Sequence, residues 1–304
     1  MSRYVLSDGR GLMTPPKKLT AAAMRDLDQF YTTSADAQWC AEQLKPFLPG
    51  YPVYLEPSAG DGVFLPYMPR ATAYDLYPMG PGIIQQDFLT LELPYDPNRV
   101  SLGNPPYGKR SQLAINFLNH CATMGDVVAF VLPPSFRKWM VQSKINEVLS
   151  LVFDQDVPGQ DYRLPNDTLI PNHRRVFQIW KREESKLGGT RGLRLCKAPP
   201  ISHPDFQMWQ YNNTPGALAV FKNKFDFAVP RQGYYDYTRR ETIAERCERN
   251  IQWILFKANS VEVLERLNNL DFGKLAERNT VTPGFGKADV VAFYCESLMA
   301  GGFS

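Results

Sequence analysis

The 304-residue chain lacks the marks of a secreted, membrane or metal-binding protein. Its five cysteines are scattered and contain no C-x-x-C pair, so the spacing predicts neither a disulfide framework nor a zinc ligand set. The first residues, MSRYVLSDGRGLMTPPKK, have no apolar signal-peptide core, and no run approaches the ~18 apolar residues of a membrane span. The sequence therefore predicts a cytoplasmic protein without a membrane or metal partner.

A strong charge imbalance is also missing. The 34 basic and 31 acidic residues give a formal net charge of +3, which is too small to indicate nucleic-acid binding by itself. Any basic surface must therefore be local. The apolar fraction of 44% and the charged fraction of 21% are those of a globular protein, and the length allows one large domain or two ordinary ones.

Strand-like and helix-like stretches alternate as far as residue 182. Short apolar stretches predict strands within 52–58, 71–78, 82–89, 99–106, 127–134, 149–157 and 174–182. Helical spacing predicts helices over 35–48, 111–124 and 135–149. This alternation predicts an α/β fold with a doubly wound, mostly parallel sheet.

The composition changes after residue 182. Residues 182–200, REESKLGGTRGLRLCKAPP, are rich in Gly, Pro and charge and predict a linker. Aromatic, turn-rich sequence follows, and then one clear helix over 260–270. We expect a first domain over residues 1–190 and a smaller α+β domain over residues 191–304.

The first of these predicted strands leads into the loop LEPSAGDG, which contains Glu56, Ser58, Gly60 and Asp61. Small residues let a ligand approach the backbone closely, and a helix expected after them would favour an anionic group at its N-terminus. A glycine-rich turn alone is weak evidence. The neighbouring strand ends must decide.

The next three strands also end in distinctive side chains. Asp75 ends the second strand, where a carboxylate can accept hydrogen bonds from ribose hydroxyls. Asp87 and Phe88 follow the third, a carboxylate for an adenine amino group beside a ring for the adenine face. Residues 104–107, Asn-Pro-Pro-Tyr, follow the fourth. A surface acid, a turn or a core ring explains any one of these; their order at successive strand ends favours one binding site.

These segments resemble a known family. LEPSAGDGVFL, AYDLYP, QQDFL and NPPYGKR are similar to motifs I, II, III and IV of the S-adenosylmethionine (AdoMet)-dependent amino-methyltransferases that act on adenine N6. Residues 27–44 resemble motif X, and the order X, I to IV, then a recognition region, matches the gamma arrangement. The resemblance covers residues 26–182. It implies a class I, Rossmann-like methyltransferase domain over 1–190 and a target-recognition domain over 191–304.

The resemblance also implies a cofactor-binding set for AdoMet. Its members come from motifs X, I, II and III: Tyr31, Thr32, Glu56, Ser58, Gly60, Asp61, Asp75, Asp87 and Phe88. Tyr31 and Thr32 are expected at the carboxylate of the cofactor and Asp75 at its ribose. The usual FYTP reads FYTT here, which leaves Thr33 without an assigned role.

The Asn-Pro-Pro-Tyr segment suits a weak nucleophile. The exocyclic amine of adenine shares its lone pair with the ring, so it must be held rather than deprotonated. The side-chain carbonyl of Asn104 and the backbone carbonyl of Pro105 can accept its two N–H bonds, and Pro105 and Pro106 fix that geometry in advance. Tyr107 can stack on the base, which is worth about 1–3 kcal/mol. These four residues are the expected catalytic set.

A stacked duplex base cannot reach such a pocket, so base flipping is expected. We expect Lys109 and Arg110 to contact phosphates, although a solvated helix start explains them equally well. For a second ring against the base the candidates are His173 and Phe177, and a core role is favoured for Phe177. Further cations that could meet the nucleic-acid backbone are Arg174, Arg175, Lys222, Lys224, Arg231, Arg239 and Arg240. For Arg174 and Arg175 the alternative is surface solubility. For the last five, aromatic strands packing in a small sheet are the alternative.

The predicted function is methyl transfer from AdoMet to adenine N6 in DNA, by an enzyme without a fused nuclease. Any restriction enzyme that acts with it would be a separate protein. RNA adenine methylation stays open as an alternative. A protein glutamine methyltransferase also uses Asn-Pro-Pro-Tyr but carries its extra domain before the AdoMet loop. An inactive nucleic-acid-binding subunit is the remaining alternative, and the intact Asn104, Tyr107, Asp75 and Asp87 weigh against it.

Overall fold

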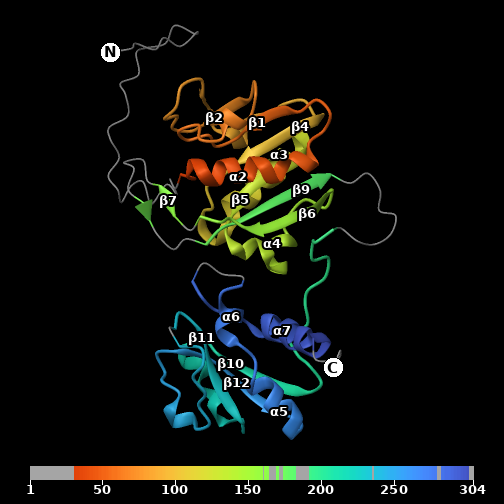
Figure 1. Cartoon of the computed structure of the whole chain (residues 1–304). Helices are drawn as coiled ribbons and strands as arrows, with labels where there is room; N and C mark the ends of the chain where they lie inside the picture. Colours follow the sequence, from red (N-terminus) through yellow and green to blue (C-terminus); the bar gives the residue numbers. More distant parts are fainter. Residues whose placement is uncertain are drawn as a thin grey trace.

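The structure, a computed structural model, describes residues 31–159, 161–163, 169–170, 174–182, 192–234, 236–278 and 282–300. The N-terminal part contains a seven-stranded sheet of order β3-β2-β1-β4-β5-β9-β6 (Figure 1). All neighbouring strands are parallel except β9, which runs antiparallel to β5 and β6. The strands are β1 Val53–Glu56, β2 Thr72–Asp75, β3 Ile84–Gln85, β4 Asp96–Gly103, β5 Gly125–Leu132, β6 Leu149–Asp156 and β9 Val176–Arg182. All seven predicted strands are present, and the expected α/β class is confirmed.

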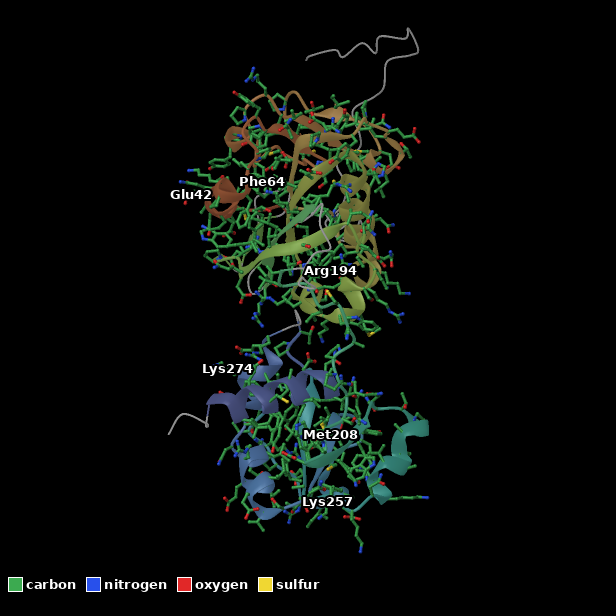
Figure 2. The ribbon with its side chains drawn as sticks, turned by 90° about the vertical axis from the view of Figure 1, so that its right-hand side faces the viewer. Glu42, Phe64, Arg194, Met208, Lys257 and Lys274 are labelled. Carbon is green, nitrogen blue, oxygen red and sulfur yellow. The ribbon has the colours of Figure 1, made fainter. Side chains whose placement is uncertain are left out.

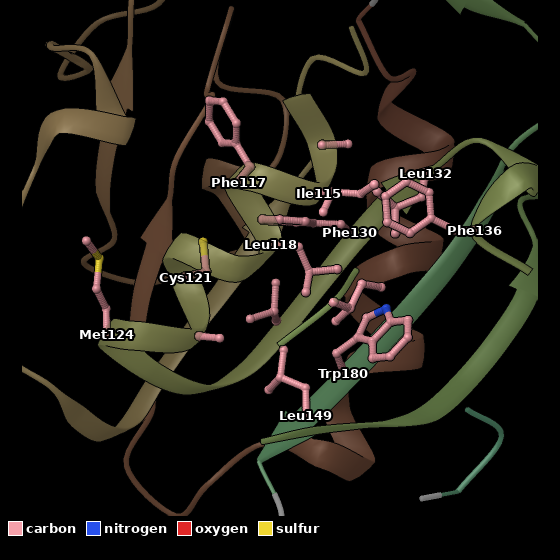
Figure 3. Packing of buried hydrophobic residues seen from close by; sticks show 14 of the residues in the cluster. Ile115, Phe117, Leu118, Cys121, Met124, Phe130, Leu132, Phe136, Leu149 and Trp180 are labelled. Carbon is pink, nitrogen blue, oxygen red and sulfur yellow. The ribbon is translucent and has the colours of Figure 1, made fainter. Parts of the chain in front are cut away.

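Helices cover both faces of this sheet, and the side chains of the inner strand β5 alternate between the two faces. On β5 the even-numbered residues of 128–132 belong to the buried cluster under α3 Gln112–Met124, which Figure 3 shows from close by. The odd-numbered residues of 127–131 belong to the cluster under α2 Ser34–Leu44. A strand buried on both faces reads as a continuous apolar run, as VVAFVL does.

The helix expected over 135–149 is wrong in length. The structure has a 3-10 turn, η5 Pro134–Arg137, and a four-residue helix, α4 Trp139–Gln142. Arg194, far along the chain, explains why residues 143–149 do not continue the helix. The buried guanidinium of Arg194 donates to four backbone carbonyls of this stretch at 2.6–3.1 Å: Gln142, Ile145, Asn146 and Leu149. Carbonyls satisfied by a side chain need no helical partner.

The helix expected after the glycine-containing loop is also missing. Between β1 and β2 the structure has only the 3-10 turn η2 Leu65–Tyr67. Gly60 and Gly62 have φ values of +54° and +82°, which a right-handed helix cannot include. The proposed helix N-terminus for an anionic group is therefore not available in this loop.

The C-terminal part contains a second, antiparallel sheet of order β10-β12-β11 with its own buried cluster. Its elements are β10 Phe206–Tyr211, β11 Phe227–Gln232, β12 Gln252–Ala258, α5 Val261–Asn268, α6 Phe272–Ala276 and α7 Lys287–Ala300. Of its helices only α5 was predicted. Figure 2 places Arg194 with the first sheet and Met208 and Lys257 with the second. The two parts touch where Lys138 lies 3.7 Å from Asp289.

The remaining elements are short. They are β7 Tyr162–Arg163, β8 Leu169–Ile170, η1 Lys45–Phe47, η3 Phe88–Thr90, η4 Lys109–Ser111, η6 Pro215–Lys222 and η7 Ala244–Arg246. Among the helices of the described residues, none has the length and apolar character needed to cross a bilayer.

Candidate functional site

A cavity of about 390 Å³ opens where strands β1, β2 and β4 end and where the chain leaves β3. Ligands of open parallel sheets bind at this edge. Eight of the predicted site residues line it: Tyr31, Ser58, Gly60, Asp75, Asp87, Phe88, Asn104 and Pro106. The structure thus brings together residues from the segments that resemble motifs X, I, II, III and IV. Other lining residues were missed, including Leu76, Tyr77, Gln86, Leu113 and Phe117; the i, i+4 spacing of the last two on one helix face was a usable signal.

Tyr31 lies directly over Gly60. A Cβ atom added to Gly60 would come within 2.7 Å of Cε1 of the Tyr31 ring, so only glycine fits there. The amide of Gly60 donates to Oδ2 of Asp75 at 2.7 Å, and the amide of Tyr77 donates to Oδ1 of Asp75 at the same distance. Asp75 therefore fixes the loop after β1 as well as facing the cavity.

The segment after Tyr31 begins helix α2, and the structure gives Thr33 a role. Its Oγ1 accepts from the amide of Asp36 at 3.2 Å and donates to Oδ2 of Asp36 at 2.8 Å, as an N-cap residue does. Asp36 is buried and pairs with Nη2 of Arg175 at 2.9 Å. Arg175 is 1% exposed, so the suggestion that it meets a nucleic-acid backbone is wrong.

Two of the predicted site residues are buried polar side chains outside the cavity lining. Thr32 and Glu56 are each 1% exposed, and Thr32 Oγ1 and Glu56 Oε2 have no hydrogen-bond partner among the described residues. Burial raises the pKa of Glu56 well above its usual value, and the charges of Asp61 and Asp75 raise it further. Glu56 and Asp61 do not line the cavity themselves.

Asp87 and Phe88 take different positions at the third strand end. Asp87 is exposed, and its carboxylate accepts from the amide of Leu89 at 3.1 Å. Phe88 is 2% exposed and stacks on Phe117, with ring centroids 5.6 Å apart. Phe88 thus reaches the cavity from the core, and the exposed carboxylate stands beside it.

The Asn-Pro-Pro-Tyr segment follows β4 directly. The hydroxyl of Ser58 donates to the backbone carbonyl of Asn104 at 3.3 Å, which joins this segment to the loop after β1. Asn104 and Pro106 line the cavity, whereas Pro105 and Tyr107 do not. Tyr107 is half-buried and packs against the cluster under α3. Its stacking on a base stays a prediction.

The next residues have an unusual backbone. Gly108, Arg110 and Ser111 have φ values of +65°, +54° and +63°. For the two non-glycine residues this conformation costs energy, and such strain tends to occur at functional sites. Lys109 and Arg110 are exposed at this point, so their side chains are accessible to a ligand.

The other predicted nucleic-acid contacts are placed unevenly. His173 lies outside the described residues. Arg174 is half-buried, with Nη2 3.3 Å from Oδ2 of Asp156. Phe177 is fully buried and packs edge-on against Trp39, which confirms its core role.

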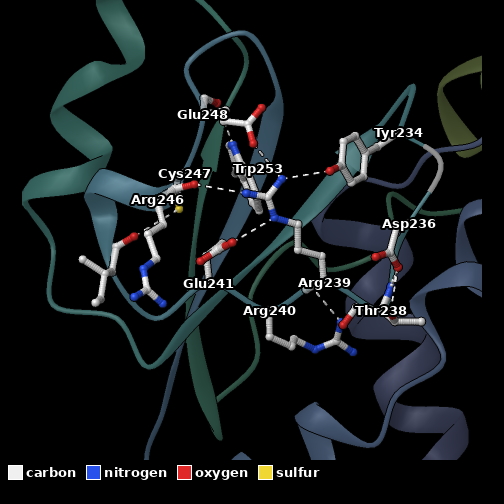
Figure 4. A network of polar contacts seen from close by, with 11 residues as sticks. Tyr234, Asp236, Thr238, Arg239, Arg240, Glu241, Arg246, Cys247, Glu248 and Trp253 are labelled. Carbon is white, nitrogen blue, oxygen red and sulfur yellow. Dashed lines mark hydrogen bonds and ion pairs between the residues drawn. The ribbon is translucent and has the colours of Figure 1, made fainter.

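Most cations of residues 221–240 serve the C-terminal sheet itself. The guanidinium of Arg231 donates to Phe285 O, Asn212 Oδ1 and Gln252 Oε1 at 2.7–3.0 Å, and burial lowers its pKa. Arg239 lies in the network of Figure 4, bonded to Glu241, Glu248 and Tyr234. Arg240 lies over the rings of Phe227 and Phe272. The cation–aromatic pattern is therefore largely internal, while Lys222 and Lys224 are exposed.

No family model and no curated protein matches the chain. Similar solved structures include a modification subunit of a candidate type I restriction enzyme from Vibrio vulnificus, 15% identical over 50% of this chain and 44% of that one, with a TM-score of 0.37. A candidate RNA methyltransferase from Pyrococcus horikoshii is 16% identical over 51% and 88%, with a TM-score of 0.39. Magnesium protoporphyrin IX methyltransferase from Synechocystis is 12% identical over 49% and 79%, with a TM-score of 0.34. The chain spans less than half of the Vibrio protein, and likenesses this distant assign no substrate.

Proposed function

We propose that this protein is an AdoMet-dependent methyltransferase that acts on the exocyclic N6 of adenine in DNA. One observation carries the proposal: a single cavity is lined by Asn104 and Pro106 together with Tyr31, Gly60 and Asp75. These residues are up to 75 positions apart (31 to 106). They are the residues that the resemblance to adenine-N6 methyltransferases assigns to one active site.

The residues present fit AdoMet. Gly60 leaves room for Tyr31 to close one wall, and Asp75 faces the cavity as a hydrogen-bond acceptor for a ribose. The acidic surroundings, Asp75, Asp87 and the buried Glu56, suit a ligand that carries a sulfonium and an ammonium group. When bound, AdoMet supplies a methyl group whose bond to sulfur breaks as the amine lone pair forms the new carbon–nitrogen bond.

The chain holds the amine in place for that transfer. Asn104 follows β4 at the cavity wall, and its backbone is fixed by the hydrogen bond from Ser58 and by the two prolines after it. We assign the side-chain oxygen of Asn104 and the carbonyl of Pro105 as acceptors for the two amine N–H bonds. Acceptors fixed in advance need little reorganisation as charge develops on nitrogen, which then gives a proton to water.

We assign the substrate strand to the exposed Lys109 and Arg110 beside the cavity, with Tyr107 turning onto the flipped base. We also assign residues 1–190 to catalysis and residues 191–304 to target recognition. The exposed Lys222 and Lys224 support this division, because they remain accessible to phosphates.

The test is transfer of labelled methyl groups from AdoMet to DNA, RNA or protein. We expect label in DNA, released as N6-methyladenine. Asn104→Ala should abolish transfer and keep AdoMet binding. Asn116→Ala, an exposed asparagine on α3 that accepts from Gln112, is the matched control and should stay active. Label in RNA alone would replace DNA as the substrate, and full activity of Asn104→Ala would refute the mechanism.

A further inference from the structure

One buried group near the cavity has no role in holding the amine. Glu56 is the last residue of β1 and is 1% exposed, and its Oε2 has no hydrogen-bond partner among the described residues. It lies against the end of β4: a Cβ added to Gly103 would be 3.6 Å from Glu56 Cγ and 3.9 Å from Oε1. The residue after Glu56, Pro57, and the residue after Gly103, Asn104, both line the cavity. Glu56 therefore lies next to the cavity wall.

We propose that Glu56 lets the site distinguish AdoMet from its spent product, S-adenosylhomocysteine, by releasing a proton when the charged methyl donor binds. This inference deepens the proposed function and rests on it. Donor and product have nearly the same shape, but the donor carries one additional positive charge on sulfur. A buried carboxyl that can lose its proton distinguishes the two ligands by this charge, which a cavity cannot do by shape alone.

The charges around Glu56 favour its neutral form before the donor binds. Asp61 in the loop after β1 and Asp75 at the end of β2 both act on it, and both raise its pKa together with burial. Gly103, which packs on it from β4, and Asn104, the next residue, carry no charge. Among the described residues no lysine, arginine or histidine pairs with it. The ammonium and carboxylate that both ligands share offset each other, so the sulfonium of the donor would supply the net positive charge that favours the carboxylate of Glu56.

The sign of the effect follows from linkage. Lowering the pKa of Glu56 on binding means that one proton leaves for solvent, so donor binding tightens as the pH rises. Where the full proton is released, affinity changes about tenfold per pH unit. The product brings no sulfonium charge, so its affinity should change little over the same range. The preference for donor over product should therefore increase with pH until Glu56 is ionised in the free protein.

The experiment is calorimetric titration of the full chain with AdoMet and with S-adenosylhomocysteine, in two buffers of different ionisation enthalpy. A pH of about 6 keeps the amino groups of both ligands charged, since α-amino groups titrate near ~7.7–8.0. We expect proton release with the donor, up to one proton per site, and close to none with the product. Glu56→Gln should lose this difference. The exposed Glu42→Gln variant on α2 should keep it.

The outcomes separate the two proposals. Absence of AdoMet binding by the wild-type protein would refute the proposed function. Binding with equal proton release for both ligands would refute only the role of Glu56. If the difference in proton release between donor and product persists in Glu56→Gln, the proton comes from another group, and the role of Glu56 is likewise refuted. The first two results need only the wild-type chain, so they do not depend on how the variants fold.

Discussion

Replacing Gly60 by alanine tests the contact on which the cofactor wall depends. The amide of Gly60 is held by Asp75, and its φ of +54° is a conformation that L residues rarely adopt. A Cβ at this position would lie 2.7 Å and 3.1 Å from two atoms of the Tyr31 ring. The substitution therefore adds backbone strain and displaces a ring that lines the cavity.

The chain contains a control that separates these two effects. Gly82 also has a positive φ, +76°, but a Cβ there would meet nothing within 4 Å. Left-handed backbone costs an alanine about 1–2 kcal/mol, and the stiffer unfolded chain returns about 0.4–1. Gly82→Ala should thus lose at most about 1.6 kcal/mol. Gly60→Ala adds an overpacking cost of about 1–3 kcal/mol.

Urea unfolding gives the two stabilities, and calorimetry gives AdoMet affinity. We expect Gly60→Ala to be less stable than Gly82→Ala by about 1–3 kcal/mol and to bind AdoMet at least about tenfold more weakly, a loss of about 1.4 kcal/mol. In a Tyr31→Ala background the added instability of Gly60→Ala should shrink to that of Gly82→Ala. Equal stability of the two glycine variants, with unchanged binding, would show that Tyr31 does not pack on Gly60.

Three further changes are informative. Asp75→Ala removes the carboxylate that accepts from two backbone amides and, in the proposed complex, from the ribose hydroxyls of AdoMet. Because hydrogen bonds to a charged group contribute about 1.5–3 kcal/mol, calorimetry should show AdoMet affinity reduced at least tenfold. Arg175→Met leaves the Asp36 carboxylate buried without its cation and should lower the free energy of unfolding by about 3–5 kcal/mol in urea. The more exposed neighbour Arg174→Met should lower it by less than about 1 kcal/mol, and similar losses for the two variants would contradict the burial argument. The pKa of Glu56 in the folded state lies above its ordinary value of 4.5, so the folded state holds this proton more firmly than the unfolded chain does. The free energy of unfolding should therefore fall as the pH rises from about 4.5, and Glu56→Gln should remove that fall in a series of urea titrations.

The sequence alone determined the strands and the residues at their ends. Periodicity is local, so the run VVAFVL shows a strand buried on both faces without any knowledge of its neighbours. The carboxyl ends of parallel strands meet at one edge, so Asp75 and Asn104 could be assigned to one site from their positions at strand ends. The structure places both at the same cavity.

Only the tertiary structure decided which distant residue pairs with a given side chain or backbone carbonyl. The helix expected over 135–149 is short because Arg194, some 50 residues later, takes its carbonyls. Arg175 looked like a surface cation but is neutralised by Asp36, 139 positions away. Glu56 looked like an ordinary motif residue, and its unusual proton affinity comes from burial and from two carboxylates that only the fold brings near. Long-range pairing leaves no periodic trace in sequence, because nothing in the local pattern records which distant group will compete for an atom.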